Sequence, residues 1–318
     1  MRLITGGSGY LGIALTHFLL DKGFEVRGFD LKKSPLLPEN IDFFQGDIRD
    51  ERAVMKACAG ISHVYHLAAL LPQRKAPPKI MRAVHMGGTE NVLRAAAEHN
   101  VQRVVFLSSS EVYGKMKIVP CPEDAPRNPL GEYARNKIEC EAICERYAKE
   151  KGLKISILRP PTLIGPGILD DAILLMMKEL RRGGIFPVIG SGRNRVQALD
   201  VMDCAQAVFV CGEKPEAIGE VFNIGCSEVP TLMEIAVEMK KYAGTRVKII
   251  RVPAAIGINL LRLLNLFGVS PMMPEHYELL TSSYMMDTTK IKKKLGWAPE
   301  KTYLQSARNM YDWYLNKL

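Results

Sequence analysis

A tyrosine and a lysine four residues apart are the first candidates for chemistry. Tyr133 and Lys137 stand in the segment EYARNK, at the start of a stretch with helical periodicity. In a helix this spacing brings both side chains to one face. A phenol has an ordinary pKa of about 10, and a nearby ammonium favours its ionised form. The pair therefore predicts a tyrosine that exchanges a proton with an alcohol, supported by the lysine.

A serine-rich segment upstream offers further polar groups. Residues 107–114, LSSSEVYG, follow a strand predicted over residues 103–107. In folds with parallel strands, ligands bind at the carboxyl ends of the strands. A hydroxyl there can bond a substrate oxygen as its charge changes, and Glu111 can act as an additional acid or base.

A glycine-rich loop near the N-terminus predicts a dinucleotide site. The segment TGGSGYLG places Gly6, Gly9 and Gly12 between the first predicted strand and the first predicted helix. Gly6 can make a tight turn, Gly9 lets the backbone approach a pyrophosphate, and Gly12 lets helix and strand pack closely. The helix N-terminus supplies free N–H groups and the positive end of a dipole.

Asp30 adds the acid that such a site needs. It lies eighteen residues after Gly12, at the end of the second predicted strand. A carboxylate there can accept both ribose hydroxyls of the adenosine half and repels a 2′-phosphate, which favours NAD over NADP. Lys32 and Lys33 keep NADP as the alternative cofactor.

These groups need a scaffold, and short β-rich runs alternate with amphipathic helical patterns up to about residue 160. This alternation predicts an α/β fold, a doubly wound parallel sheet of Rossmann type. We expect strands over residues 2–5, 25–30, 42–45, 63–67, 103–107 and 154–158. We expect helices over residues 11–22, 51–58, 80–99 and 133–151.

The alternation ends after Pro160, where glycine and proline clusters occupy residues 165–167, 183–184 and 190–192. A strand-like run at 221–224 indicates that the chain returns to the sheet. We therefore expect a smaller, discontinuous C-terminal domain. The predicted boundaries are 1–165 with 193–226 for an NAD-binding domain, and 166–192 with 227–318 for a substrate-binding domain.

Composition fits an ordinary globular protein: the 318 residues are 47% hydrophobic and 24% charged. The net charge is +9, but lysine and arginine are spread along the chain, and only Lys292–Lys294 forms a dense run. This distribution argues against a nucleic-acid partner and suits an anionic small substrate. The seven cysteines form no CxxC pair and share no metal-ligand spacing with the six histidines, so we expect reduced thiols and no metal.

The chain shows no signal peptide at its start, and we expect a cytoplasmic protein. The segment 254–269 is the most apolar, but it is shorter than the roughly 20 residues of a membrane span and contains Arg262. We expect no membrane span and interpret this segment as a buried or substrate-covering helix.

Together these motifs resemble the extended short-chain dehydrogenases/reductases of the NAD-dependent epimerase/dehydratase type. The resemblance runs nearly from end to end. Its marks include the glycine loop, Asp30, GDI at 46–48, HLAA at 66–69, GTEN at 88–91, Tyr133 with Lys137, RP at 159–160, FNIG at 222–225 and LGWAP at 295–299.

The resemblance implies roles for these residues. Ser109 would polarise the substrate oxygen and Tyr133 would be the base, while Lys137 would also bond the nicotinamide ribose. Glu111 stands where dehydratases and decarboxylases of the family carry a working glutamate. The implied cofactor contacts come from Gly6, Gly9, Tyr10, Leu11, Gly12, Asp30, Asp47, Ile48, Leu67, Ala68, Ala69, Tyr133, Lys137 and Pro160. The implied substrate contacts come from Ser109, Ser110, Thr162 and Arg195, and family members usually form homodimers through a bundle that includes the tyrosine helix.

Three departures bear on the substrate. His85 stands where the family usually has asparagine, four residues before Thr89. Thr162 lies near a position where nucleotide-sugar enzymes often have asparagine. No arginine-proline-glycine-aspartate motif precedes Asp287, although Arg195 belongs to a segment that resembles the family's arginine-to-VxD stretch and can bind a diphosphate.

We therefore expect an NAD-dependent epimerase or dehydratase that abstracts hydride from a carbinol carbon of a nucleotide sugar, typically C4. The alternative is an NAD(P)-dependent oxidoreductase of a hydrophobic alcohol or ketone, similar to 3β-hydroxysteroid dehydrogenases, which the apolar 254–269 segment favours. A third reading, a regulator that senses redox state by binding NAD, has no need of Ser109, Tyr133 and Lys137.

Overall fold

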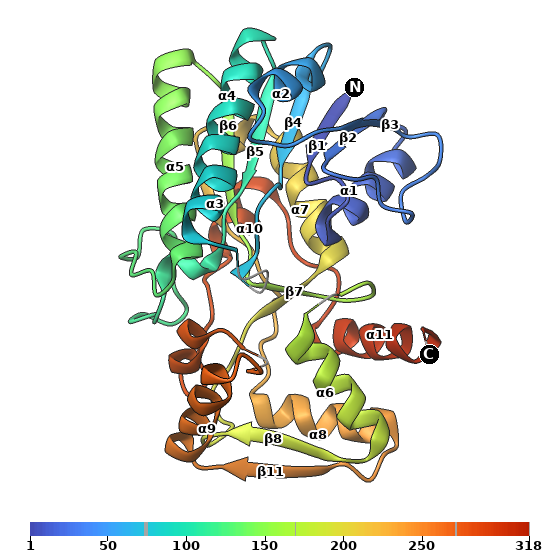
Figure 1. Ribbon diagram of the computed structural model, residues 1–318, viewed down its shortest axis with the longest axis vertical. Helices are drawn as coiled ribbons and strands as arrows, with labels where there is room; N and C mark the ends of the chain where they lie inside the picture. Colours follow the sequence, from blue (N-terminus) through green and yellow to red (C-terminus); the bar gives the residue numbers. More distant parts are fainter. Residues whose placement is uncertain (73–75, 169, 271, 318) are drawn as a thin grey trace.

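The main sheet forms the upper part of the molecule in Figure 1. The structure is a computed structural model that describes residues 1–72, 76–168, 170–270 and 272–317. Within these residues the main sheet has seven strands in the order β10-β6-β5-β4-β1-β2-β3, and all neighbours are parallel. The strands are β1 (Arg2–Thr5), β2 (Val26–Asp30), β3 (Asp42–Gln45), β4 (His63–His66), β5 (Arg103–Leu107), β6 (Ile155–Arg159) and β10 (Val221–Asn223).

This sheet confirms the predicted fold class and the positions of the strands. Each predicted strand is present, and each bound agrees within one residue. The strands are predictable because parallel strands are covered on both faces and therefore read as short continuous apolar runs. Both faces carry a buried core: Leu15 and Phe222 belong to one, and Leu93 and Phe106 belong to the other.

Helices cover both faces of the sheet. One layer holds α1 (Tyr10–Asp21) and α7 (Val201–Glu213), which pack against each other, and the opposite layer holds α2 (Glu51–Cys58), α4 (Gly88–Glu98) and α5 (Glu132–Lys151). The predicted helix over residues 80–99 has three parts: α3 (Pro78–Arg82), a π-helical turn η2 (Ala83–Gly87), and α4. Such turns are rare and occur frequently at functional sites.

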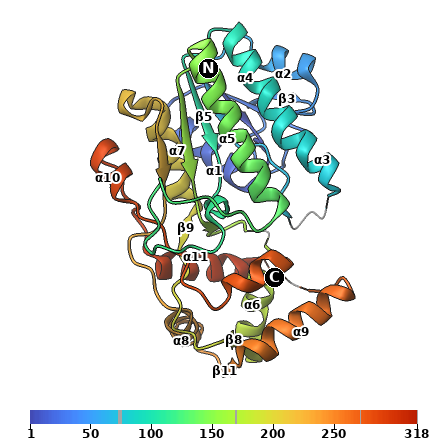
Figure 2. The ribbon, with the colours of Figure 1, turned by 90° about the vertical axis from the view of Figure 1, so that its left-hand side faces the viewer.

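After β6 the chain builds the lower part of the molecule. There, β7 (Thr162–Ile164) pairs with β9 (Ala198–Asp200), and β8 (Ile185–Ile189) pairs with β11 (Lys248–Val252). The helices of this part are α6 (Asp171–Arg182), α8 (Leu232–Ala243), α9 (Ala254–Leu266) and α11 (Tyr303–Asn316), as Figure 2 shows from the side. Short 3-10 turns are η3 (Ser110–Tyr113), η4 (Pro215–Ala217) and η5 (Pro274–Leu279).

The helix before the last returns toward the main sheet. The helix α10 (Thr289–Leu295) packs beside β10, and its Ile291 and Leu295 are buried in the core beneath the sheet with Trp297. The chain thus passes between the two parts more than once. The predicted domain boundaries stay a prediction.

The apolar segment 254–269 forms a helix over residues 254–266. Of the two expected alternatives, a buried helix is wrong, and a substrate-covering helix stays a prediction. Only Gly257 and Leu261 of α9 are buried, whereas Leu266 and the following Phe267 are 81% and 73% exposed. The reason is that α9 packs through one narrow line of residues. Within the described residues, no helix combines the length and apolar character that crossing a membrane requires.

Candidate active site

The predicted tyrosine and lysine lie together at the start of α5. Tyr133 and Lys137 are both almost fully buried, and the Lys137 ammonium lies 5.7 Å from the centre of the Tyr133 ring. The Lys137 Nζ donates a hydrogen bond of 2.7 Å to the carbonyl oxygen of Leu107, the last residue of β5. The lysine therefore ties the tyrosine helix to the carboxyl end of the central sheet.

Ser109 joins this pair, as expected. It lies just beyond β5 and caps η3, where its Oγ accepts a 3.1 Å hydrogen bond from the N–H of Glu111. Its side chain also lies close enough to Tyr133 to lower the pKa of the phenol. Serine, tyrosine and lysine thus form one connected group at the edge of the sheet where ligands bind in this architecture.

The electrostatics of this group are those of a buried proton-transfer site. Burial raises the pKa of Tyr133, the charge of Glu111 raises it further, and the neighbouring Ser109 side chain lowers it. Burial also lowers the pKa of Lys137, which disfavours its charged form. Tyr133 is therefore protonated at neutral pH in the absence of another positive charge, ready to donate its proton.

A buried ionic network holds the segment around the site. The Glu141 carboxylate, on the same helix as Tyr133, accepts hydrogen bonds from Arg159 Nε at 2.9 Å and Nη2 at 2.7 Å, and from the Ser108 hydroxyl at 2.5 Å. Arg159 Nη1 also donates to the Tyr113 hydroxyl, which in turn donates to Asn223 Oδ1, both at 2.7 Å. The network links α5, β6, η3 and β10, and it fixes the serine segment against the tyrosine helix.

The glycine loop has the shape that was predicted for a pyrophosphate. Gly6 has φ +72°, a conformation that glycine adopts without strain, and a Cβ added at Gly12 would lie only 2.1 Å from the Gly6 carbonyl oxygen. Within the described residues, α1 has neither a side-chain cap nor an acid in its first turn. The N–H groups of Tyr10, Leu11 and Gly12 therefore remain available to an anionic ligand.

Asp30 lies at the end of β2 and faces the same loop. One of its carboxylate oxygens accepts a 3.0 Å hydrogen bond from Ser8 N, and the other accepts a 2.8 Å bond from Leu31 N. Each carboxylate oxygen keeps a further lone pair for a hydroxyl group. The arrangement fits a ribose beside the glycine loop.

The segment after β4 closes the other side of this loop. A Cβ added at Gly6 would lie 2.9 Å from the backbone of Ala68, so the two loops are in contact. Leu67 and Ala69 flank Ala68 and are partly exposed. Behind them, burial lowers the pKa of His66 to about 3. Its neutral ring bridges the hydroxyls of Thr5, at 2.7 Å, and Thr89, at 3.0 Å.

The predicted adenine contacts, Asp47 and Ile48, follow β3, the strand at one edge of the main sheet. The Asp47 carboxylate pairs with Arg49, and the hydrogen bonds from Arg49 hold the pKa of Asp47 below its usual range. Ile48 is buried against Gly88, where an added Cβ would lie 2.9 Å from its side chain. Arg49 is therefore the cation nearest to this predicted contact.

His85, the first departure from the family pattern, lies beside the tyrosine. It stands in the π-helical turn η2, and its ring meets the Tyr133 ring edge-on, with ring centres 5.5 Å apart. Nε2 bonds the backbone of Leu70 at 3.0 Å, while Nδ1 is buried without a hydrogen-bond partner. Burial and the charge of Lys137 lower the pKa of His85 to about 3, so the ring is neutral.

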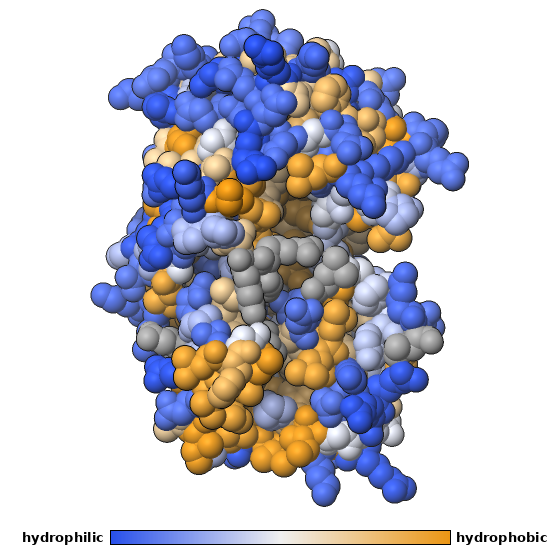
Figure 3. Space-filling model, viewed as in Figure 1, coloured by the Kyte–Doolittle hydropathy of each residue, from blue (hydrophilic) through white to orange (hydrophobic). Residues whose placement is uncertain are grey.

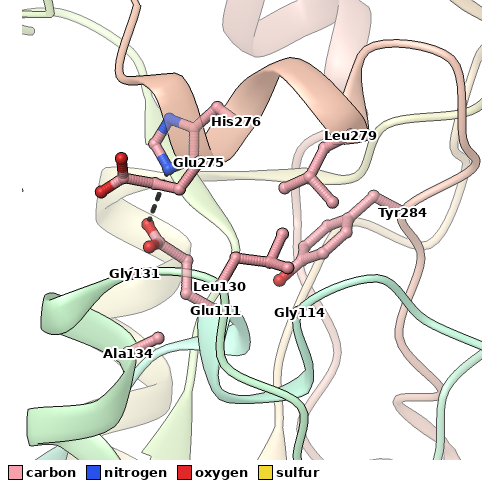
Figure 4. Close-up of a pocket in the computed structure, with 9 residues that line it drawn as sticks. All are labelled: Glu111, Gly114, Leu130, Gly131, Ala134, Glu275, His276, Leu279 and Tyr284. Carbon is pink, nitrogen blue, oxygen red and sulfur yellow. Dashed lines mark ion pairs between the residues drawn. The ribbon is translucent and has the colours of Figure 1, made fainter.

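A small pocket opens beside this group, between the start of α5 and η5 (Figure 4). Glu111 and His276 face each other across it, with 3.6 Å between the carboxylate oxygen and Nε2, and this contact raises the pKa of His276. Burial opposes that rise. Glu275 lies against Gly131, where an added Cβ would meet its carboxylate at 2.7 Å. Glu111 is therefore paired with a histidine from the lower part of the molecule.

The sequence analysis did not identify Glu275, His276 or Tyr284 as site residues. An acid directly followed by a histidine, in the segment MMPEHYELL at 272–280, is the local signal that marks the first two. Tyr284 donates a 3.2 Å hydrogen bond to the Ser110 hydroxyl. The buried Ser110 is thus engaged by the protein, and its N–H bonds the Pro160 carbonyl oxygen at 2.9 Å.

The remaining predicted substrate residues lie apart from this group. Arg195 donates to the Val229 carbonyl oxygen and lines a second pocket with Glu234 and Tyr303, near the starts of α8 and α11. Thr162 is exposed on β7. The structure therefore does not bring the Arg195 guanidinium to Tyr133.

The model of the NAD dependent epimerase/dehydratase family matches residues 2–225. An uncharacterised protein of Sinorhizobium fredii is 33% identical over 98% of this chain and 78% of its own length. A dTDP-glucose 4,6-dehydratase of Streptomyces niveus is 27% identical over 98% of this chain and 92% of its own. Among solved structures, a UDP-glucose 4-epimerase of Thermotoga maritima determined with UDP-glucose has the same fold, with a TM-score of 0.84, 24% identity and 99% of each chain covered.

Proposed function

The chain belongs to the NAD-dependent epimerase/dehydratase family, and on that basis we propose that it is an NAD-dependent epimerase or dehydratase of a nucleotide sugar. The observation that carries the proposal is the connected group of Ser109, Tyr133 and Lys137 at the carboxyl end of the sheet. The similarity to a dehydratase of nucleotide sugars supports the substrate class.

The residues around the glycine loop fit NAD. The N–H groups at the start of α1 would bind the pyrophosphate, and Asp30 would accept the adenosine ribose hydroxyls. Asp47, Ile48 and Leu67–Ala69 would line the adenine and the adjoining ribose, and the Pro160 segment would border the nicotinamide half. A carboxylate at Asp30 disfavours a 2′-phosphate, although Lys32 lies exposed nearby and keeps NADP as the alternative.

The side chains of the site have separate roles in the reaction of the sugar. Ser109 bonds the reacting hydroxyl, and Tyr133 takes its proton and later returns it. Lys137 stabilises the ionised phenol and orients it from α5. Bound NAD supplies a hydride acceptor and a further positive charge. Glu111, with His276, is placed to move a second proton, which a dehydratase requires and a 4-epimerase does not.

A substitution pair tests the chemistry. Tyr133→Phe with Lys137→Ala should reduce turnover by roughly 10²–10⁴-fold, because it removes the proton acceptor and its support. Tyr147→Phe, on the same helix and bonded to Glu90, is the matched control. An unchanged rate in the double variant would refute the assigned roles.

The substrate class is tested by thermal shift with NAD present. Uridine, guanosine and thymidine diphosphate sugars are compared with sterol-like and aromatic alcohols. A ligand at 100 times its Kd should add about 2.7 kcal/mol of stability. Stabilisation by one diphosphate sugar supports the proposal, whereas stabilisation by apolar alcohols alone contradicts it.

One observation favours the second candidate, an oxidoreductase of a hydrophobic alcohol or ketone. The Arg195 guanidinium is engaged by the Val229 carbonyl, away from Tyr133, so the arginine expected to bind a diphosphate is not directed at the site. Net reduction of NAD by an apolar alcohol, without a sugar nucleotide, is the result that would establish this candidate.

The proposal includes a homodimer formed through the α5 surface, as the similarity to the family implies. Light scattering of the purified protein gives the mass directly. A monomer at micromolar concentration would contradict this part.

A further inference from the structure

The helix α9 carries an apolar stripe that is exposed in the part of the chain that the structure describes. Ile256, Leu260, Leu263 and Phe267 follow one another at spacings of three or four residues, and each is more than half exposed. In a helix this spacing places them on one face. Patches of this kind on a soluble protein mark an interaction surface.

The packing of α9 explains the exposure. Gly257 faces the sheet, where an added Cβ would lie 3.0 Å from Ile189, and Leu261 is buried one turn later. Since neighbouring residues are about 100° apart around a helix, the stripe led by Ile256 lies beside this buried line. The apolar face of α9 is therefore wider than the surface that the sheet covers.

The outer face of the two-stranded sheet extends the apolar patch. Ile185 of β8 and Ile250 of β11 are 51% and 41% exposed. Figure 3 shows hydrophobic residues gathered over α9 at the lower left of the molecule and continuing along its lower edge. Together these exposed residues form one surface, the docking face: Ile256, Leu260, Leu263, Leu266, Phe267, Ile185 and Ile250.

The chain segment that carries α9 and β11 bears charge of one sign. The segment 244–270 contains no aspartate or glutamate. It carries four cations, all exposed: Arg246, Lys248, Arg251 and Arg262. An exposed apolar face bordered by arginine and lysine is the pattern of a helix that lies in the interface of an anionic membrane.

We propose that the docking face attaches the protein to the surface of an anionic lipid bilayer, with α9 lying in the plane of the interface. At 13 residues, α9 is too short to span the bilayer. A second copy of the chain fits the same face poorly. In a two-fold dimer the patch meets itself, so the four cations of one copy would be brought to the same interface as those of the other.

Attachment at this face would bring the active site close to the lipid. The chain runs from α9 into η5 within a few residues, and the Tyr277 hydroxyl of η5 donates a 3.1 Å hydrogen bond to the Leu261 carbonyl oxygen. The next residue back, His276, faces Glu111 in the pocket. A substrate held in or on the bilayer would thus be within reach of the site.

Vesicle sedimentation tests the proposal on the full chain. Vesicles of phosphatidylglycerol with phosphatidylcholine are compared with vesicles of phosphatidylcholine alone, at low and high salt. We expect binding to the anionic vesicles that weakens as salt screens the four cations. No binding to the anionic vesicles at low salt would overturn the proposal.

Two variants separate the apolar and charged contributions. Leu263→Asn with Phe267→Asn should lower partitioning roughly tenfold or more, because both side chains lose their place in the interface. The control is Ile118→Asn with Leu315→Asn, which are also exposed but lie elsewhere. Equal losses in both double variants would overturn the assignment of α9.

Arg251→Gln with Arg262→Gln keeps the test decisive if the apolar variant fails to fold. It should weaken binding to anionic vesicles and leave the thermal unfolding curve in place. Light scattering tests the competing occupant of the docking face, a second copy of the chain. The opposing result has two parts: the wild type forms an oligomer that the α9 variant does not form, and the wild type fails to bind vesicles. These two results together would assign the face to a second copy and overturn the proposal.

Discussion

Replacing His85 by asparagine should make the protein more resistant to acid. His85 is 2% exposed, and its pKa of about 3 keeps the native ring neutral down to low pH. In the unfolded chain the same ring has a pKa of about 6.5. Lowering the pH below 6.5 therefore protonates only the unfolded state, so stability is present above this value and is lost as the pH falls toward 3.

The size of the effect follows from these two values. At pH 5, protonation lowers the free energy of the unfolded chain by about 2 kcal/mol, and at pH 7.5 by less than about 0.1 kcal/mol. Because the native pKa lies well below 5, its exact position hardly changes the result. Wild type should therefore lose about 2 kcal/mol more than His85→Asn between pH 7.5 and pH 5.

Urea unfolding at the two pH values measures this difference. His17→Asn is the control, since that ring is exposed on α1. His66→Asn should repeat the effect, because burial gives its ring the same low pKa of about 3. Equal losses in wild type and His85→Asn would refute the reasoning, since they would mean that the native ring accepts a proton.

Three further substitutions probe the site. Gly12→Ala should lower stability by about 1–3 kcal/mol and abolish NAD binding, because its Cβ would meet a carbonyl oxygen at 2.1 Å. Thermal shift measures both effects. The control is Gly87→Ala, which should be neutral because its Cβ would meet nothing within 4 Å. Asp30→Asn should weaken NAD binding by roughly ten- to a hundredfold in a fluorescence titration, and an unchanged Kd would remove Asp30 from the cofactor site. Glu141→Gln should cost about 3–5 kcal/mol in urea unfolding because Arg159 stays charged and buried, while Glu145→Gln, on the exposed side of α5, should cost little.

The fold was predictable because its signals are local. The strands of the main sheet are short β-rich runs, and their alternation with helices leaves one class of architecture. Tyr133 with Lys137 was predictable for a similar reason, because a spacing of four fixes the relative direction of two side chains once the helix exists. The glycine loop belongs to the same category, since its strand, turn and helix are consecutive.

What the sequence did not reveal depends on contacts between distant segments. His276 faces Glu111 only because η5 folds against the start of α5, and no periodicity encodes that approach. Arg195 lies in an extended segment, where neighbouring side chains alternate between two sides, so its direction depends on pairing that sequence alone does not give. The periodicity of α9 shows which residues form its apolar face, and it does not show what covers them.

The ionic network around Arg159 is completed late in the synthesis of the protein. Its members come from positions as far apart as Tyr113 and Asn223, and β10, which carries Asn223, is the last strand to join the sheet. At roughly 5–20 residues per second, the ribosome needs several seconds to add the 64 residues from Pro160 to Asn223. During that interval β6 is a free edge strand that can pair with another nascent chain. Chaperone demand and losses to aggregation should therefore concentrate in this part of translation.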